Sequence, residues 1–306
     1  GLVWNDVNGN KNQEISEEAV NGANIGAGIL TGNILYANLI DASGIVIASV
    51  QVQPDGTYSF PFVPQSATGL IIQLSINQGV IGLAKPATAL PAGWNNTGEN
   101  KNGQGGAADV VNNGEIILTT STATITAQNF GIEQTPQTAI NLQPSAGNPG
   151  GFNTINIPAA VFLNSNVGSN PNTEDYNGGF VLSIRITAFP AGVNSIIINN
   201  VIYTNGGSCP PASTCVGWPV GGVTIPAPNG IISQTVLIDP LDGNTNVVIP
   251  IAAIDNAGLE DPTPGNITIP FKTIAVSGTV FNDRNGNIII DGSEASINGT
   301  NSGAGI

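Results

Sequence analysis

The sequence predicts an all-β protein built as two tandem β-sandwiches. Charged residues make up only 8% of the chain and hydrophobic residues 41%, and Ile, Val and Thr outnumber the helix formers Glu, Lys and Met. Such residues favour strands. Short apolar runs alternate with Gly, Pro and Asn turns, as in antiparallel sandwiches. A chain of 306 residues can bury two cores, so we expect two immunoglobulin-like or prealbumin-like sandwiches.

A long internal repeat sets the organisation of the chain. Residues 1–29 reappear without a gap as residues 278–306. The shared positions include Asn5-Asp6 with Asn282-Asp283, Asn8-Gly9-Asn10 with Asn285-Gly286-Asn287, and Glu17 with Glu294. A fixed period of this length predicts an array, here one full repeat followed by the start of the next.

Each predicted sandwich is a series of short strands between turns. In the first, we expect strands at residues 34–41, 45–52, 57–63, 70–76, 80–83, 115–119 and 123–130. In the second, we expect them at residues 140–142, 152–157, 161–163, 180–189, 195–203, 231–238, 245–251 and 267–276. The turn-rich segment 133–137 interrupts the pattern. The predicted domains are therefore residues 1–134, residues 138–275 and residues 276–306, the last being the first part of the next repeat.

Local patterns support these strands. The runs ILYANLID and IVIASVQV flank the turn Ala42-Ser43-Gly44, which predicts a hairpin. After the turn signal Pro54-Asp55-Gly56, the aromatic residues Tyr58, Phe60 and Phe62 alternate as one buried face of a strand would require. Residues 93–114 are rich in Gly and Asn, so we expect them to form a polar loop.

The charge and the missing residue types narrow the function. The net charge is −14, and six Lys and Arg residues cannot supply the cationic stripe that nucleic acids require. Divalent cations suit this acidic chain better. The chain has no His, which removes Ser-His and Cys-His nucleophile pairs and the usual zinc sites. Hydrolysis by paired carboxylates stays open. These residues contain no membrane-length apolar run and no recognisable signal peptide.

Cys209 and Cys215 are the two cysteines, and they lie in the loop-like run GGSCPPASTCVGW. A disulfide is favoured over two free thiols, because the Pro pair between them suits neither a redox pair nor a metal site. Closing such a small loop contributes roughly 2 kcal/mol in the chain-entropy model.

Residues 6–17 follow the ligand spacing of a twelve-residue calcium loop. With Asp6 as position 1, oxygen-bearing side chains fall at positions 3, 5, 9 and 12, and a backbone carbonyl serves at position 7. The predicted ligands are Asp6, Asn8, Asn10, Asn12, Glu14 and Glu17, and in the second copy Asp283, Asn285, Asn287, Ile289, Asp291 and Glu294. Asn12 and Ile289 stand at position 7, where the side chain is unimportant. Glu18 corresponds to Ala295, so Glu18 is not a predicted ligand.

The loop departs from the usual pattern at position 6. The Gly expected there is Lys11 in one copy and Ile288 in the other, and a Gly stands at position 4 instead. This predicts a distorted turn or a weakly held ion. The alternative is an Asn- and Gly-rich turn that hydrogen-bonds only with itself. Because the two copies keep the oxygen donors while other positions drift, we favour calcium at millimolar extracellular concentrations.

Other acidic and aromatic residues give weaker signals. Pairs or groups of carboxylates that suggest a further cation site, although solvated turns and strand caps are favoured, are Asp239 with Asp242, Asp255 with Glu260 and Asp261, Glu174 with Asp175, and Asp41 with Asp55. Trp4 and Phe281 occupy one aligned position and are expected in the core. Trp94 and Trp218 fall in expected loops, where packing is favoured over glycan contact.

The motif WNDVNGNKNQEISEE, followed by DGTYSF, resembles the B-type repeats of staphylococcal serine-aspartate repeat surface proteins and collagen adhesins. The resemblance implies an extracellular β-sandwich that holds calcium in an EF-hand-like loop and serves as a rigid stalk. Residues 1–132, which end in ATITAQNFGIE, are similar to repeats of large secreted surface proteins of Bacteroidetes, including the gliding and adhesion class. For residues 138–275 the appearance is only immunoglobulin-like or cadherin-like.

Together these observations predict a structural repeat unit of a bacterial cell-surface stalk, fibre or filament. The expected cofactor is calcium, which would stiffen loops between repeats. The expected partners are copies of the chain itself, arranged in tandem, laterally or head to tail. The alternative is a module that binds surface glycans through loops 93–114 or 206–222. A carboxylate-based hydrolase is the weakest of the three, so we do not expect an enzyme.

Overall fold

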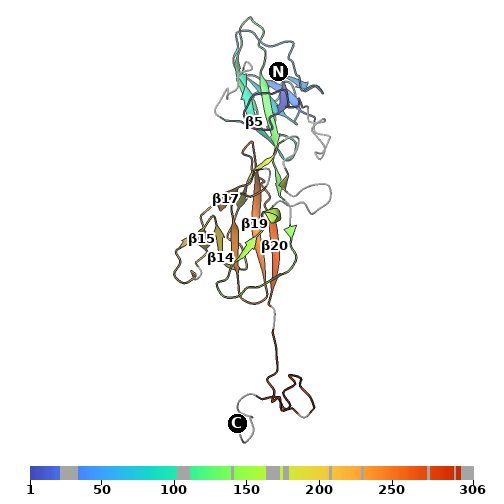
Figure 1. Cartoon of the computed structure of the whole chain (residues 1–306). Helices are drawn as coiled ribbons and strands as arrows, with labels where there is room; N and C mark the ends of the chain where they lie inside the picture. Colours follow the sequence, from blue (N-terminus) through green and yellow to red (C-terminus); the bar gives the residue numbers. More distant parts are fainter. Residues whose placement is uncertain are drawn as a thin grey trace.

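The structure is a computed structural model. It describes residues 1–20, 34–101, 111–138, 141–162, 173–174, 179–206, 209–228, 231–273, 276–292 and 294–297. These residues form strands and one four-residue helix, α1 (Ala159–Phe162), which confirms the predicted all-β class (Figure 1). No helix among them is long enough to cross a membrane.

The N-terminal unit (residues 1–134) consists of two sheets that face each other. The three-stranded sheet has the order β1-β7-β5, and the four-stranded sheet has the order β3-β2-β4-β6. Their bounds are β1 (Val3–Asn5), β2 (Tyr36–Ile40), β3 (Val46–Gln51), β4 (Thr68–Ser75), β5 (Trp94–Asn100), β6 (Glu115–Thr119) and β7 (Asn129–Gln134). Buried residues from both sheets, among them Val3, Leu39, Ile72 and Phe130, form one apolar core.

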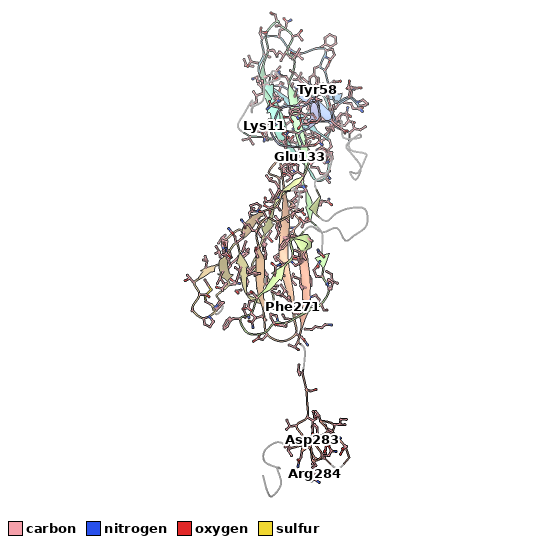
Figure 2. The ribbon with its side chains drawn as sticks, viewed as in Figure 1. Lys11, Tyr58, Glu133, Phe271, Asp283 and Arg284 are labelled. Atoms are coloured by element: carbon pink, nitrogen blue, oxygen red, sulfur yellow. A yellow bond between two sulfur atoms is a disulfide. The ribbon has the colours of Figure 1, made fainter. Side chains whose placement is uncertain are left out.

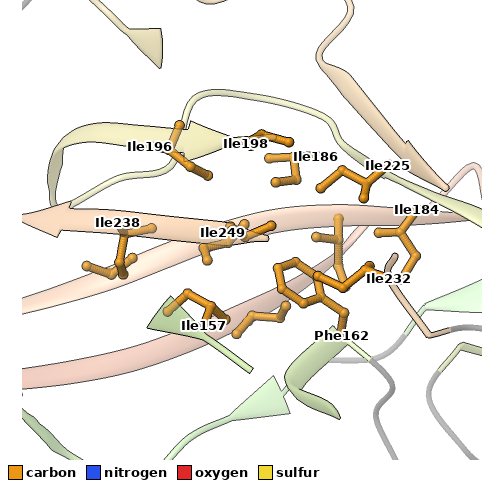
Figure 3. Packing of buried hydrophobic residues seen from close by; sticks show 14 of the residues in the cluster. Ile157, Phe162, Ile184, Ile186, Ile196, Ile198, Ile225, Ile232, Ile238 and Ile249 are labelled. Carbon is orange, nitrogen blue, oxygen red and sulfur yellow. The ribbon is translucent and has the colours of Figure 1, made fainter. Parts of the chain in front are cut away.

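The second unit (residues 138–275) has its own core between two larger sheets (Figures 1 and 3). One sheet has the order β10-β20-β19-β13-β17, with β9 also pairing β20, and the other has the order β11-β18-β14-β15-β16. The bounds of the first are β9 (Asn141–Leu142), β10 (Ala146–Gly147), β13 (Val181–Ile186), β17 (Val223–Pro226), β19 (Thr245–Asp255) and β20 (Gly265–Lys272). Those of the second are β11 (Ile155–Ile157), β14 (Val193–Ile198), β15 (Val201–Thr204), β16 (Cys215–Gly217) and β18 (Val236–Pro240).

The connector between the units is held by backbone and side-chain contacts. β7 continues to Gln134, and β8 (Gln137–Thr138) then pairs with β12 (Thr173–Glu174). Thr138 is anchored twice, because its N–H donates to Asp261 Oδ2 (2.6 Å) and its Oγ1 accepts the N–H of Ala253 (2.9 Å). The segment expected to break the strand pattern therefore contains only a short interruption.

Several predicted strands are wrong or displaced. Residues 57–63 make one isolated bridge, from Thr57 to Leu2, and Phe62 is 87% exposed although Tyr58 is buried. Residues 80–83 form a turn, and the first two residues of the strand expected at 161–163 belong to α1, while Leu163 lies outside the described residues. The strand expected at residues 195–203 is two strands, β14 and β15, because Asn199 and Asn200 adopt positive φ and reverse the chain. The predicted 93–114 loop contains β5.

The described part of the C-terminal copy, residues 278–292 and 294–297, lies beyond the second unit in the view (Figure 1). It keeps the bridge pattern of the first copy, because Phe281 pairs with Ser296 as Trp4 pairs with Ala19. Val280 is 69% exposed there, whereas its counterpart Val3 is fully buried.

Candidate metal centre

Strand β1 positions the start of the 6–17 loop. β1 runs parallel to β7, with Val3 opposite Phe130 and Asn5 opposite Ile132. Val3 and Trp4 are fully buried, which anchors the strand in the core. The Asp6 N–H then donates to the Ile132 carbonyl (2.9 Å), so the Asp6 carboxylate is fixed at the end of β1 and is itself fully buried.

The predicted side-chain ligands at positions 3, 5 and 9 meet one another. Asn8 Nδ2 donates to Glu14 Oε2 (2.7 Å) and Asn10 Nδ2 donates to Glu14 Oε1 (2.6 Å). The Asn8 and Asn10 side-chain oxygens accept backbone N–H groups within the loop, from Asn10 (3.0 Å) and Asn12 (2.7 Å). The polar groups of the loop therefore hydrogen-bond with one another. The side-chain NH₂ groups of Asn8 and Asn10 face Glu14, whereas a bound cation would need the side-chain oxygens there.

Glu17 closes the loop at position 12. Its Oε2 accepts the Glu14 N–H (3.0 Å), and Glu17 N–H donates to the Glu14 carbonyl (3.1 Å). Its Oε1 is buried and has no hydrogen-bond partner in the part of the chain that the structure describes. Burial raises the pKa of Glu17 to about 7, and the charges of Asp6 and Glu14 add to the effect.

The pKa of Asp6 is shifted in the same direction as the pKa of Glu17. Burial raises the pKa of Asp6, although hydrogen bonds from Thr97 and from backbone N–H groups at Lys11 and Asn10 oppose the shift. The neighbouring Glu14 carboxylate raises it further. Three carboxylates therefore lie near one another without a cationic side chain between them, an arrangement that a divalent cation would stabilise.

The residue at position 6, where the usual loop sequence has Gly, still adopts a backbone conformation typical of glycine. Lys11 has φ of 66° and Ile288 has φ of 63°, so both non-glycine residues adopt the left-handed conformation for which this position normally uses Gly. The Lys11 N–H points to Asp6 Oδ2 (3.2 Å), and the Ile288 N–H points to Asp283 Oδ2 (2.8 Å). The two copies therefore share the same left-handed backbone at position 6, although neither has Gly there.

The second copy repeats the arrangement group by group. Asn285 Nδ2 donates to Asp291 Oδ2 (2.8 Å) as Asn8 donates to Glu14, and Asn287 N–H donates to Asn285 Oδ1 (3.0 Å) as Asn10 donates to Asn8. Asp291 N–H reaches Glu294 Oε2 (3.4 Å). At position 7, Asn12 and Ile289 both donate their N–H to the Asn side chain at position 5, and both side chains are exposed.

The described residues contain no group of three or more His, Cys, Asp or Glu side chains arranged to hold a metal. The carboxylates of the 6–17 loop are thus not gathered as closely as in a preformed metal site. A bound ion would need Asn8 and Asn10 to present their side-chain oxygens in place of their amide groups, and it would need the carbonyl of Asn12.

The loop also contacts the second unit. A Cβ placed on Gly9 would lie 2.9 Å from the Cα and the carbonyl oxygen of Ala257, so the backbone of Gly9 rests against the turn that follows β19. We call this contact the joint. The sequence suggested a position between repeats, whereas the first copy of the loop lies between the two units of one repeat.

The other carboxylates singled out in the sequence are spread over both units. In the N-terminal unit, Asp41 and Asp55 accept backbone N–H groups of their own turns, from Ser43 (2.9 Å) and Thr57 (3.1 Å). The side chains of Glu174 and Asp175 lie outside the described part of the structure.

Asp255 is fully buried at the end of β19; its Oδ1 accepts the Leu259 N–H (2.7 Å), and its Oδ2 has no partner among the described residues. Asp261 is satisfied by Thr263 and Thr138, and Glu260 pairs with Arg185. Asp239 lies on β18, is fully buried, and neither of its oxygens has a partner within the described part of the chain.

Trp94 and Trp218 pack against other side chains, which was favoured over glycan contact. Trp94 belongs to β5 and is 5% exposed. Trp218 makes edge contacts with Phe189 and Tyr203, at centroid distances of 5.7 Å and 5.5 Å. Neither forms an exposed platform of the kind that binds glycans. The disulfide between Cys209 and Cys215 is present, as predicted.

Comparisons with known proteins identify no relative: no family model, no curated protein and no solved structure matches the chain.

Proposed function

We propose that the chain is a structural repeat unit of an extracellular stalk or filament on a bacterial surface, and that calcium bound in the 6–17 loop stiffens it. The unit has no catalytic role in this proposal. The observation that carries it is the joint: the loop with calcium-ligand spacing rests through Gly9 on Ala257 of the second unit. An ion that fixes the loop would therefore also fix one unit on the next.

The chemistry of the loop supports calcium over other cations. All the expected ligands are oxygens, which suit a hard cation, and the chain has no His for zinc. Glu17 stands at position 12, where calcium loops use a bidentate carboxylate, and its Oε1 is buried beside the other loop carboxylates. Asn8 and Asn10 can turn their side-chain amides so that Oδ1 faces the ion. Glu14 would then bind the cation in place of the two N–H donors that it now accepts from.

The conserved loop backbone supports a second calcium position in the 283–294 loop. Both copies keep the left-handed residue at position 6 and the hydrogen bond from its N–H to the carboxylate at position 1. The strained conformation at Lys11 and Ile288 costs of order 1 to 3 kcal/mol unless the surroundings compensate. A bound ion at the centre of each loop is such a compensation.

The proposal is tested by calcium titration of the full chain after treatment with a chelator. We expect each loop to bind one calcium ion in calorimetry and the melting temperature to rise, because a ligand that binds only the folded state stabilises it. Glu17→Gln should remove one ion, and the neighbouring Glu18→Gln should remove none, since Glu18 is exposed and is Ala295 in the other copy. A chain that shows no heat and no thermal shift with millimolar calcium contradicts the proposal.

The structural role is tested by small-angle X-ray scattering. With calcium, the distribution of maximum dimensions should narrow around one elongated particle, and chelation should broaden it. If calcium binds but the scattering is unchanged, the loop is a calcium site without a stiffening role. The extracellular setting fits the Cys209–Cys215 disulfide, because such bonds persist in oxidising compartments.

A further inference from the structure

We propose that the second unit holds a further cation site, built on Asp239 and Ser195, which takes calcium. The site lies on strands β14 and β18 and in the turn that follows β18, so it shares no residue with the two calcium loops and does not depend on them. We call it the bulge site and define it by Asn194, Ser195, Asp239 and Asp242.

Asp239 and Ser195 stand directly opposite each other on neighbouring strands. β14 and β18 are antiparallel, with Ser195 opposite Asp239 and Ile196 opposite Ile238. Ile196 and Ile238 belong to the apolar core of the second unit (Figure 3). Because successive side chains along a strand point to opposite faces, Ser195 and Asp239 both face away from that core. Side chains placed in this way have Cβ atoms about 5 Å apart, so the two groups share one space.

Both side chains are buried, and neither has a hydrogen-bond partner among the described residues. Asp239 and Ser195 are each 0% exposed. The atoms without a partner are both carboxylate oxygens of Asp239 and the hydroxyl oxygen of Ser195. Asp239 also belongs to neither of the ion pairs within the described part of the chain. Because proteins pair buried carboxylates or use them to bind metals, these oxygens indicate a cation.

A β-bulge in β14 brings a third polar side chain to the same place. Val193 pairs with Pro240 and Ser195 pairs with Asp239, so Asn194 is the extra residue of the bulge. Asn194 Nδ2 donates to the carbonyl of Pro240, the residue next to Asp239 (3.4 Å). A rotation of this amide would turn Asn194 Oδ1 toward a cation beside Asp239.

Asp242, in the turn after β18, supplies a second carboxylate. Burial raises the pKa of Asp239, the Asn194 amide opposes this shift, and the charge of Asp242 raises the pKa further, so the two carboxylates are close. The turn is fixed, because Gly151 N–H donates to Asp242 Oδ1 (2.7 Å) and Asn148 Nδ2 donates to two carbonyls of the turn (2.7 Å each). A divalent cation between the two carboxylates would remove their repulsion.

The set of donors suits calcium. It contains only oxygens, from carboxylates, a hydroxyl and an amide, and water molecules would complete the roughly six to eight ligands that calcium takes. Magnesium requires a near-ideal octahedron, which ligands from a bulge and a turn are less suited to provide. Two carboxylates are a low charge count, so we expect binding at millimolar calcium.

The first test uses the full chain with both calcium loops silenced by Glu17→Gln and Glu294→Gln. Titration of calcium chloride into this chain, after treatment with a chelator, should give heat for one ion per chain. Adding Asp239→Asn should abolish that heat, and adding Ser195→Ala should lower the affinity several-fold. Asp55→Asn is the matched control, because it removes a carboxylate from an exposed turn of the other unit and should leave the heat unchanged.

The outcomes for the bulge site and for the loops are separate. The bulge site is overturned if the silenced chain gives no calcium heat, or if the heat survives Asp239→Asn. The loop proposal is judged by the ion that Glu17→Gln removes from the parent chain, so the failure of one proposal is distinguishable from the failure of the other.

Thermal melts of the silenced chain give a second test, which also shows that the variant folds. In a chelator, Asp239→Asn should melt at or above the temperature of the silenced chain, because it removes a buried unpaired charge. In millimolar calcium, the silenced chain should melt at the higher temperature, because it alone binds the ion. The proposal is overturned if the order is the same with and without calcium, as for a carboxylate satisfied by a proton or a water molecule.

Discussion

Ile288 and Lys11 are the residues at which the loop sequence and the loop backbone disagree. Both adopt a positive φ, which side chains with a Cβ disfavour and which is rarest for β-branched residues such as Ile. Ile288 is 86% exposed, so packing does not offset the strain. The 283–294 loop is therefore expected to hold calcium less tightly than a loop with Gly at this position.

Ile288→Gly should increase the calcium affinity of the 283–294 loop by roughly fivefold to tenfold, because removing about 1 kcal/mol of strain favours the ordered loop. Calorimetry on the full chain with Glu17→Gln and Asp239→Asn, which silence the other proposed sites, isolates this site. Ile288→Ala is the matched control, since alanine keeps a Cβ. Equal gains for alanine and glycine would show that the backbone conformation is not the cause.

Asp255 is a second residue whose environment sets a measurable property. Burial raises its pKa to about 6, against opposing backbone hydrogen bonds from Leu259 and its neighbours. A raised carboxyl pKa means that the folded state holds the proton more tightly than the unfolded state. The contribution of Asp255 to stability is thus fully present below the unfolded pKa of 3.8 and is lost as the pH rises through about 6.

Asp255→Asn should remove this part of the pH dependence. The asparagine keeps an oxygen for the Leu259 N–H and carries no charge, so the calcium-free variant should be more stable than the parent by roughly 1 kcal/mol at neutral pH, after allowance for solvent screening. Thermal melts between pH 4 and about 8 in a chelator measure the difference. A gap between the two chains that does not grow as the pH rises contradicts the assignment.

At the scale of elements, β1 is short but makes a large contribution to the N-terminal unit. Its Val3 and Trp4 are fully buried, and Gly131 on β7 leaves room for the Trp4 ring, because a Cβ there would lie 2.9 Å from Trp4 Cζ2. The aligned Phe281 indicates that a smaller ring is acceptable at this position.

Trp4→Ala should therefore destabilise the N-terminal unit by about 3 to 5 kcal/mol, as for other buried aromatic residues. Trp4→Phe should cost about 1.5 kcal/mol or less, since it keeps a ring and removes an unpaired N–H. Urea unfolding monitored by circular dichroism gives both values. Similar costs for the two variants would mean that the space filled by Trp4 does not accept phenylalanine.

The elements that the sequence predicts well are those in which apolar runs flank a short turn. The β2–β3 hairpin was predicted from two apolar runs and is confirmed. β5 was missed because its sequence, WNNTGEN, is polar, and its buried polar groups find partners far away in the chain. Asn100 Nδ2, for example, donates to the Lys11 carbonyl (2.6 Å). Such pairing is not visible in local sequence.

The same limit applies to the candidate site. The spacing of Asn8, Asn10 and Glu14 placed these three side chains together correctly, because they are close in the sequence. That this loop binds calcium stays a prediction. The contact of Gly9 with Ala257 joins residues that are far apart in the sequence, and no pattern in either segment indicates it. The joint could therefore be identified only from the three-dimensional structure.

At the scale of the whole molecule, two cores lie along one elongated chain, and the joint connects them (Figures 1 and 2). A second contact lies at the connector between the units, where the Thr138 N–H donates to Asp261 Oδ2. If these contacts set the angle between the units, substitutions at a few residues should change it.

Ala257→Lys should loosen the joint without affecting calcium binding, because Ala257 contacts the loop backbone at Gly9 and supplies no predicted ligand. Scattering should show a broader range of dimensions in calcium than for the parent, while calorimetry shows the same number of ions. Leu241→Lys is the control, since Leu241 is exposed outside the joint. Unchanged scattering for Ala257→Lys would show that the joint does not set the angle.

The parallel pairing of β1 with β7 has a mechanical consequence. The chain enters the N-terminal unit at one end of β1 and leaves it at the opposite end of β7, so a pulling force on the two ends acts along both strands in opposite directions. The hydrogen bonds between them would have to break together under shear instead of opening one after another. In the proposed stalk, the force of flow would thus be resisted by β1, the shortest strand of its sheet. Single-molecule stretching should find the unfolding force lowered most by mutations at Val3 and Trp4.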